Sequence, residues 1–152
     1  MFLQKVDMWR NKGKGVILFF NEDVSFVLRH KQKIRNIIKT IISNNGKCLG
    51  EVSYIFCTDE YLYNLNIKYL NHDTYTDVIT FDYCDGERIN GEIYVSIERV
   101  KENAKKFNVN FYNELYRVIF HAILHLVGYN DKTTKEKHII TSQENYYLNM
   151  LK

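Results

Sequence analysis

The sequence predicts an α+β fold, in which a small mixed β-sheet of about four strands is packed with helices around one central, buried helix. Two observations lead to this prediction. Segments with strand-type patterns alternate with segments whose apolar residues recur every three to four positions, which is the period of a helix. One helical segment, residues 111–127, is apolar around most of its circumference, as is typical of a helix surrounded by other elements.

Each predicted element rests on its own pattern of residues. Apolar or alternating runs rich in β-branched and aromatic residues predict four strands, at residues 16–20, 51–57, 77–83 and 89–95. Apolar residues at helical spacing predict five helices, at residues 28–45, 58–70, 97–107, 111–127 and about 133–150. The first strand is continuously apolar and is predicted to be buried. The third and fourth strands are joined through the turn signal Asp85–Gly86, so we expect them to be antiparallel.

Length and composition favour a single domain, residues 1–152, with a sizeable core. Of the 152 residues, 45% are hydrophobic and 26% are charged, as in ordinary globular proteins. The net charge of +3 permits an anionic partner without requiring one. No apolar stretch approaches the ~18 residues of a membrane helix, and residues 1–14 lack the apolar segment of a signal peptide. We therefore expect a cytoplasmic protein with no membrane partner.

The central helix carries two histidines four residues apart, His121 and His125. Positions i and i+4 share one face of a helix, so both imidazoles can bind one metal ion. Gly128 can adopt the left-handed conformation that reverses a chain at a helix end, which would bring Asp131 back toward the same ion. Three protein ligands leave a fourth position open, as in catalytic zinc sites. The sequence thus predicts one Zn²⁺ ion held by His121, His125 and Asp131.

Other interpretations of these residues remain open. A histidine inside an apolar helix is often a hydrogen-bonded core residue, and a site with two histidines and one carboxylate can also hold iron. His138, which follows on the next predicted helix, is either an alternative third ligand or a solvent-facing side chain. The common metalloprotease motif H-E-x-x-H places a glutamate base after the first histidine. Ala122 occupies that position here, so an ordinary zinc protease is not expected.

The segment H-A-I-L-H-L-V-G-Y-N-D, residues 121–131, resembles the signature H-G-x-L-H-L-x-G-Y-D-H of the YbeY family of bacterial endoribonucleases and rRNA maturation factors. Upstream segments are similar to further family blocks in the same order, L-N-I-K-Y followed by Asp73, T-D-V-I-T-F and G-E-I, at residues 65–69, 76–81 and 91–93. The combination of these blocks is far more specific than the two histidines alone.

This resemblance implies a zincin-like fold around a central metal-binding helix and a zinc-dependent hydrolase that cleaves RNA phosphodiester bonds. It implies a preference for single strands, a role in 16S rRNA 3′-end maturation and ribosome quality control, and partners among rRNA, ribosomal subunits and ribosomal proteins. By position, His121 and His125 are metal ligands, and Asp131 stands where the family usually has a third histidine. A metal-bound water is the expected nucleophile, while no general base can be named from the sequence.

A second departure from the family concerns Leu70, which stands where the family usually has an arginine. Leucine cannot form a charge-assisted hydrogen bond with phosphate. His72 is a candidate for part of that role, and a solvated loop histidine is the alternative. Leu70 keeps open a second function class, a ribosome-assembly factor with weak or no catalysis and a mainly structural metal. A metallohydrolase that acts on another substrate, such as a peptide, is the third class.

Two groups of side chains are candidates for RNA contacts. RNA bases often stack on aromatic rings, and the candidate rings, each of which can also be a packed core residue, are Tyr69, Tyr75, Tyr83 and Tyr129. A basic stripe on the first helix either contacts phosphates or forms a solvated helix face, and its residues are Lys31, Arg35 and Lys39. Residues 76–81 are expected to lie beside the metal helix as one wall of the cleft.

Replacing Asp131 with histidine tests how the third ligand sets the charge of the site. Two neutral histidines and a carboxylate leave a zinc site with a net charge near +1, whereas three neutral histidines leave it at +2, so bound water should be more acidic in the variant. We expect Asp131→His to retain metal and to shift the rise of activity to lower pH. Metal analysis and a pH–rate profile check this, and an unshifted profile in a metal-loaded variant would contradict the charge argument.

Overall fold

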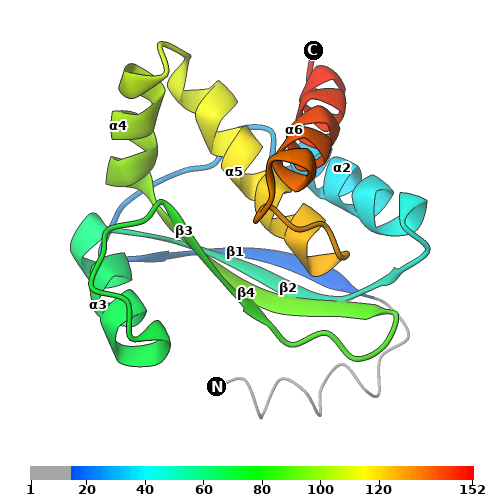
Figure 1. Ribbon diagram of the computed structural model, residues 1–152, viewed down its shortest axis with the longest axis horizontal. Helices are drawn as coiled ribbons and strands as arrows, with labels where there is room; N and C mark the ends of the chain where they lie inside the picture. Colours follow the sequence, from blue (N-terminus) through cyan, green and yellow to red (C-terminus); the bar gives the residue numbers. More distant parts are fainter. Residues whose placement is uncertain (1–14) are drawn as a thin grey trace.

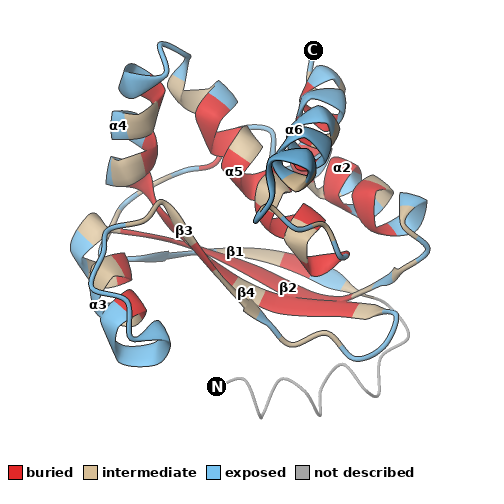
Figure 2. Cartoon of the chain, viewed as in Figure 1, coloured by how far each residue is buried: buried red, intermediate tan, exposed pale blue. Residues whose placement is uncertain are grey.

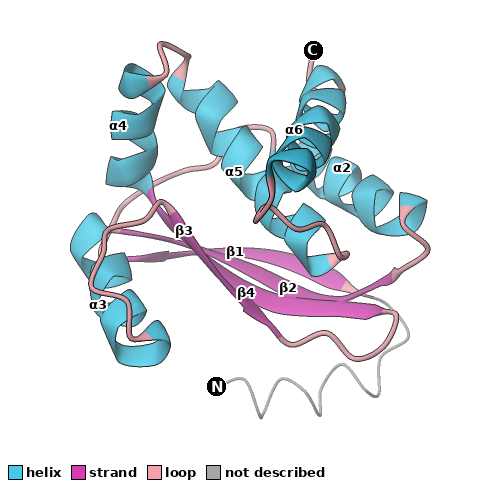
Figure 3. Cartoon of the chain, viewed as in Figure 1, coloured by secondary structure: helices cyan, strands magenta, loops and turns pink. Residues whose placement is uncertain are grey.

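The computed structural model describes residues 15–152 and has the predicted α+β architecture (Figure 3). Its strands are β1 (Val16–Glu22), β2 (Cys48–Cys57), β3 (Val78–Asp82) and β4 (Arg88–Ser96). Its helices are α2 (Lys31–Asn44), α3 (Asp59–Leu70), α4 (Ile97–Lys106), α5 (Phe111–Leu126) and α6 (Thr134–Asn149). No helix in residues 15–152 is long and apolar enough to cross a membrane. The expectation about a signal peptide concerns residues 1–14, which lie outside the described residues.

The four strands form one mixed sheet in the order β1-β2-β4-β3. Strands β1, β2 and β4 are parallel to one another. Strands β3 and β4 are antiparallel, as the short connection between them predicted, with Val78 opposite Val95 and Asp82 opposite Gly91. Strands β1 and β3 therefore form the two edges of the sheet, and β3 is the edge that lies beside His121, His125 and Asp131.

The sheet separates two groups of helices (Figure 1). Helices α2, α4, α5 and α6 lie over one face, and α3 packs against the other face at one end of the sheet. Side-chain alternation along β4 explains this division, because neighbouring residues of a strand point to opposite faces. Ile93 and Val95 join the main core under α5, whereas Tyr94 packs with Leu62 of α3 in a second, smaller cluster.

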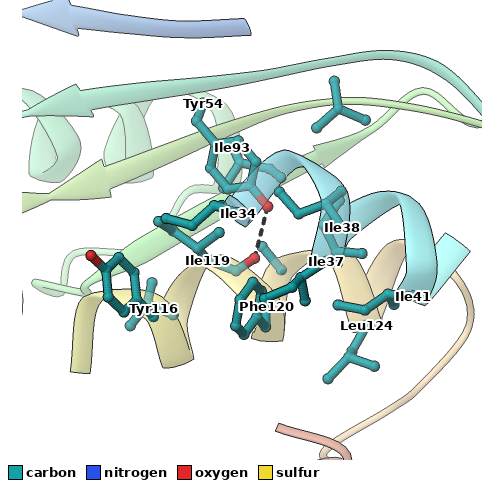
Figure 4. Close-up of a cluster of buried hydrophobic side chains, with 14 of the residues drawn as sticks. Ile34, Ile37, Ile38, Ile41, Tyr54, Ile93, Tyr116, Ile119, Phe120 and Leu124 are labelled. Atoms are coloured by element: carbon teal, nitrogen blue, oxygen red, sulfur yellow. Dashed lines mark hydrogen bonds between the residues drawn. The ribbon is translucent and has the colours of Figure 1, made fainter. Parts of the chain in front are cut away.

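Helix α5 lies at the centre of the main core, as its apolar circumference predicted (Figure 2). Figure 4 shows isoleucines of α2 and side chains of the sheet gathered against α5; the residues labelled there include Ile34, Ile37, Ile38, Ile41, Tyr54, Ile93, Ile119, Phe120 and Leu124. Tyr54 of β2 is fully buried, and its hydroxyl donates a hydrogen bond of 2.7 Å to the carbonyl oxygen of Ile119. This bond links the sheet directly to the backbone of α5.

The prediction that the first strand is buried is wrong. Val16 and Phe20 of β1 are 41% and 45% exposed, and only Ile17 is fully buried. The reason is that β1 is an edge strand, so one of its faces and one of its sides remain uncovered. A continuous apolar run does not reveal whether a strand lies at the centre or the edge of a sheet.

The start of the first helix also differs from its prediction. Helix α2 begins at Lys31 rather than at Leu28, because His30 adopts a left-handed conformation with φ of 61° that a helix cannot include. Leu28 is nevertheless buried, which explains why it fits the apolar pattern of the helix.

The proposed basic stripe on α2 is interrupted at its middle residue. Arg35 donates a hydrogen bond of 3.1 Å to the carbonyl oxygen of Ile17, and its guanidinium lies over the ring of Phe19. The side chain therefore connects α2 to the open edge of β1. Lys31 and Lys39 remain exposed on either side of it.

The Tyr54 hydroxyl provides a test of how firmly α5 is attached to the sheet. We expect Tyr54→Phe to lower the free energy of unfolding by about 1 kcal/mol, because it removes one buried hydrogen bond and little apolar surface. Tyr146→Phe is the matched control, since Tyr146 is 56% exposed and should change stability by less than about 0.5 kcal/mol. Urea denaturation of both variants measures the difference, and equal midpoints would show that the bond contributes nothing.

Candidate metal centre

Helix α5 has one polar stripe along an otherwise buried surface. From Glu114 to Leu126 every residue of α5 is buried except Arg117, His121 and His125, which recur at every fourth position. Their side chains are 25–31% exposed, so solvent reaches them without surrounding them. The fold thus presents both histidines on one face of a helix that is held rigidly by the core.

The end of α5 returns the chain toward this stripe. Gly128 has a φ of 118°, its amide donates to the carbonyl oxygen of His125, and the amide of Tyr129 donates to the carbonyl oxygen of Leu124. This pair of bonds is the Schellman arrangement, which ends a helix with a left-handed residue. The reversal was predicted from Gly128, and it places Asp131 beside the two histidines.

The side-chain atoms of His121, His125 and Asp131 converge on one point. The Nε2 atoms of His121 and His125 are 3.0 Å apart. Oδ2 of Asp131 lies 3.4 Å from Nε2 of His121 and 3.3 Å from Nε2 of His125. Atoms bound at ~2.0–2.1 Å to one tetrahedral zinc ion lie roughly 3.3–3.4 Å from one another. The three atoms therefore have the spacing of ligands around an ion of this size.

Hydrogen bonds on the far side of each imidazole fix where its proton lies. Nδ1 of His121 is 2.6 Å from a carboxylate oxygen of Glu144, and Nδ1 of His125 is 2.8 Å from the carbonyl oxygen of Tyr129. Because these oxygens act only as acceptors, each Nδ1 donates its proton. In the neutral rings both Nε2 atoms then present lone pairs to each other and to the Asp131 carboxylate. This arrangement is repulsive unless positive charge lies between the three atoms, and such outer hydrogen bonds are typical of metal-binding histidines.

The surroundings of His121 also favour positive charge at this point. Burial lowers the pKa of His121, but the hydrogen bond to Glu144 and the nearby carboxylates of Asp131 and Asp77 outweigh it and raise the pKa above its usual value. Glu144 is itself only 5% exposed, and its carboxylate forms an ion pair with Arg117 at 2.8 Å. Arg117 also donates a hydrogen bond of 2.7 Å to the side-chain oxygen of Asn145. Arg117, Glu144 and His121 therefore form a connected chain of contacts that orients one imidazole.

Sequence reasoning missed the supporting residues Arg117, Glu144 and Asp77. Arg117 could have been found, because it precedes His121 by the same four residues that separate the two histidines. Asp77 lies in the segment that was expected to form a wall of the cleft. Glu144 comes from α6, and no local pattern marks its partner, since the contact depends on how two helices pack.

Two cavities flank the convergent atoms. One, of about 530 Å³, is bounded by the β3 segment and α5, and its lining includes Thr76, Asp77, Val78, Thr80, His121 and His125. The other, of about 340 Å³, lies between α5 and α6, and its lining includes Asp77, Glu114, Arg117, His121, Lys137 and Glu144. Residues of the segment 76–81 thus form one wall, as expected.

The remaining candidates lie away from these cavities. His72 is exposed in the loop after α3, His138 is exposed on α6, and Leu70 is 41% exposed at the end of α3; none of the three lines either cavity. Tyr69 and Tyr75 are more than half exposed, whereas Tyr83 and Tyr129 are partly buried. Within residues 15–152, His121, His125 and Asp131 form the one group of three potential ligands that lie within 4.8 Å of one another.

Comparison with known proteins identifies close relatives over most of the chain. The family model described as Endoribonuclease YbeY matches residues 19–152. A protein named Endoribonuclease YbeY from Christiangramia forsetii is 49% identical over 131 residues, 86% of this chain and 91% of the relative. The protein of the same name from Flavobacterium johnsoniae is 48% identical over 82% of this chain and 90% of its own length. The solution structure of TM1509 from Thermotoga maritima aligns with a TM-score of 0.63 at 27% identity, covering 89% of this chain and 88% of that one.

Glu144→Gln tests the hydrogen bond behind His121. The amide can still accept from Nδ1, but it loses the charge that polarises the imidazole, so we expect zinc affinity to fall by about 10–100-fold while the protein stays folded. Glu136→Gln is the matched control, because Glu136 is a carboxylate of the same helix that serves the α6 capping box instead. Titration with zinc against a chromophoric chelator measures both affinities, and equal values for the two variants would contradict the role of Glu144.

Proposed function

Because this chain belongs to the YbeY family of endoribonucleases, we propose that it cleaves RNA with one zinc ion held by His121, His125 and Asp131. The observation that carries the metal assignment is the convergence of two imidazole lone pairs and a carboxylate within 3.0–3.4 Å of one another. Two histidines and one carboxylate suit zinc and leave a coordination position for substrate. A zinc ion there supplies Lewis-acid chemistry, by polarising a phosphoryl group and lowering the pKa of water.

The residues around the ligands have separate tasks in this proposal. Glu144 and the carbonyl oxygen of Tyr129 hold the two imidazoles in the tautomer that binds a metal. Lys137 lines the cavity beside His121 and provides positive charge for a phosphate. Leu70 lines neither cavity and supplies no charge for a phosphate.

The free edge of β3 can bind the RNA strand. The amide of Ser96 donates to the carbonyl oxygen of Asp77, and the amide of Tyr83 donates to the carbonyl oxygen of Asn90. The backbone groups of Asp77 and Tyr83 therefore face β4. Backbone groups alternate in direction along a strand, and those of Thr80 and Asp82 therefore point away from the sheet. Their side chains line the larger cavity beside the histidines. This edge offers hydrogen-bond donors and acceptors to an extended substrate next to the metal ligands.

The family resemblance supplies the substrate and the setting of the proposal. We assign single-stranded rRNA as substrate, 16S rRNA 3′-end maturation and ribosome quality control as the process, and ribosomal subunits as partners in the cytoplasm. The open cleft fits this assignment, because its two cavities lie on either side of one set of ligands and leave a path for a strand.

His125→Ala separates catalysis by the metal centre from a structural role. We expect metal content to fall from one ion per chain and cleavage of a structured rRNA fragment to fall by on the order of 10²–10⁴, since Lewis-acid stabilisation by a metal is worth several kcal/mol. His138→Ala is the matched control, because that histidine is exposed and lies outside the ligand group.

Three measurements on both variants are needed: bound metal, cleavage rate and thermal stability. Cleavage that persists unchanged without metal would contradict the enzyme assignment for this site. Loss of metal together with loss of the folded state would favour the alternative, an assembly factor whose metal is mainly structural.

A further inference from the structure

Glu114 is a buried carboxylate without a hydrogen-bonding partner. It lies on α5 two helical turns before His121, and only 6% of its surface is exposed. Among the hydrogen bonds and ion pairs of residues 15–152, none involves its carboxylate. Buried carboxylates in folded proteins are almost always paired. Glu114 lines the cavity between α5 and α6, so donors for its carboxylate there must come from water or from a ligand.

The neighbouring cation Arg117 makes its hydrogen bonds with other residues. Arg117 directs one nitrogen to Glu144 at 2.8 Å and another to Asn145 at 2.7 Å. Burial raises the pKa of Glu114 above its usual value, and the neighbouring carboxylates of Asp77 and Glu144 raise it further, against a lowering by Arg117. The carboxylate is thus held at a free-energy cost that hydrogen-bond donors from a ligand would reduce.

The cavity in front of Glu114 has the size and walls of a small-ligand site. Its volume is about 340 Å³, within the ~300–1,000 Å³ range of such sites. Val118 and Ile140 give it apolar walls, while His121 and Asp131 border it on the side of the metal ligands. A flat group that carries N–H donors could enter between the apolar walls while an attached phosphate lies at the metal.

We propose that this cavity, the Glu114 pocket, binds a guanine base of the RNA next to the scissile phosphate, with the carboxylate accepting hydrogen bonds from N1–H and the N2 amino group. Guanine presents two adjacent N–H donors, which match the two oxygens of one carboxylate. Adenine and cytosine each pair an amino group with an acceptor nitrogen, and uracil flanks its single N–H with carbonyl oxygens, so all three place an acceptor against the carboxylate. Unstacked bases of single-stranded RNA are commonly read on this edge. The inference rests on the proposed function, because it requires a phosphate at the metal site.

Mapping cleavage sites in a pool of RNA with randomised sequence tests the pocket. The wild-type protein should favour guanine at one fixed position relative to the cut. Glu114→Gln, which keeps the size of the side chain and replaces one acceptor with a donor, should reduce that preference by roughly 10–100-fold, the discrimination expected from one bidentate contact to a base. Glu102→Gln is the matched control: it makes the same change at an exposed carboxylate that lines neither cavity, and it should leave the guanine preference in place.

Binding of 5′-GMP and 5′-AMP to the zinc-loaded protein, followed by NMR shifts of the Val118 and Ile140 methyl groups, gives a readout that does not depend on cleavage. Selective 5′-GMP binding that Glu114→Gln abolishes supports the pocket, even if RNA is not cut, in which case the proposed function alone fails. RNA cleavage without guanine preference and without 5′-GMP selectivity overturns the pocket alone.

Urea denaturation separates ligand binding from a structural role. Because the carboxylate has no partner in the protein, Glu114→Gln should unfold at a urea concentration no lower than the wild type. A clear loss of stability would mean that Glu114 serves the fold, and it would overturn the inference.

Discussion

The burial of α5 between the sheet, α2 and α6 is the constraint on which the rest of the structure depends. The helix is covered along its length by apolar side chains and is tied to β2 by the hydrogen bond from Tyr54 to Ile119. A helix held in this way has little freedom to rotate, so the direction of its one polar stripe is set by the core. His121 and His125 owe their fixed positions to side chains that have no role in chemistry.

The cleft is unusually acidic for a protein that acts on a polyanion. Five carboxylates line the two cavities, those of Asp77, Asp82, Glu114, Asp131 and Glu144. The cations in these linings are Arg117 and Lys137, and Arg117 is already paired with Glu144. Without a metal the cleft would repel phosphate, because like charges at short range in a partly buried site are weakly screened. An ion held by His121, His125 and Asp131 would therefore make the cleft attractive to RNA as well as reactive.

Local sequence patterns predicted the elements of the fold and the three convergent residues, because both depend on spacing along one segment. The i, i+4 histidines follow from helix geometry, and the return of Asp131 follows from the left-handed Gly128. What could not be predicted depends on packing between distant segments. The exposure of β1 depends on its position at the edge of the sheet, and the contact of Glu144 with His121 depends on how α6 packs against α5. The carboxylate of Glu114 has no hydrogen-bond partner among residues 15–152 because the guanidinium of Arg117 is directed to Glu144 instead.

The three convergent residues come from a stretch of only eleven, residues 121–131, whereas Glu144 contacts His121 from α6 and Asp77 lines the same cavities from the residue before β3. Closing so short a loop around an ion costs little chain entropy, so a partly folded chain can already capture a metal. Full orientation of His121 must wait until α6 has docked. An ion that binds more tightly once α6 has docked would stabilise the docked arrangement, by the difference between its binding free energies before and after docking.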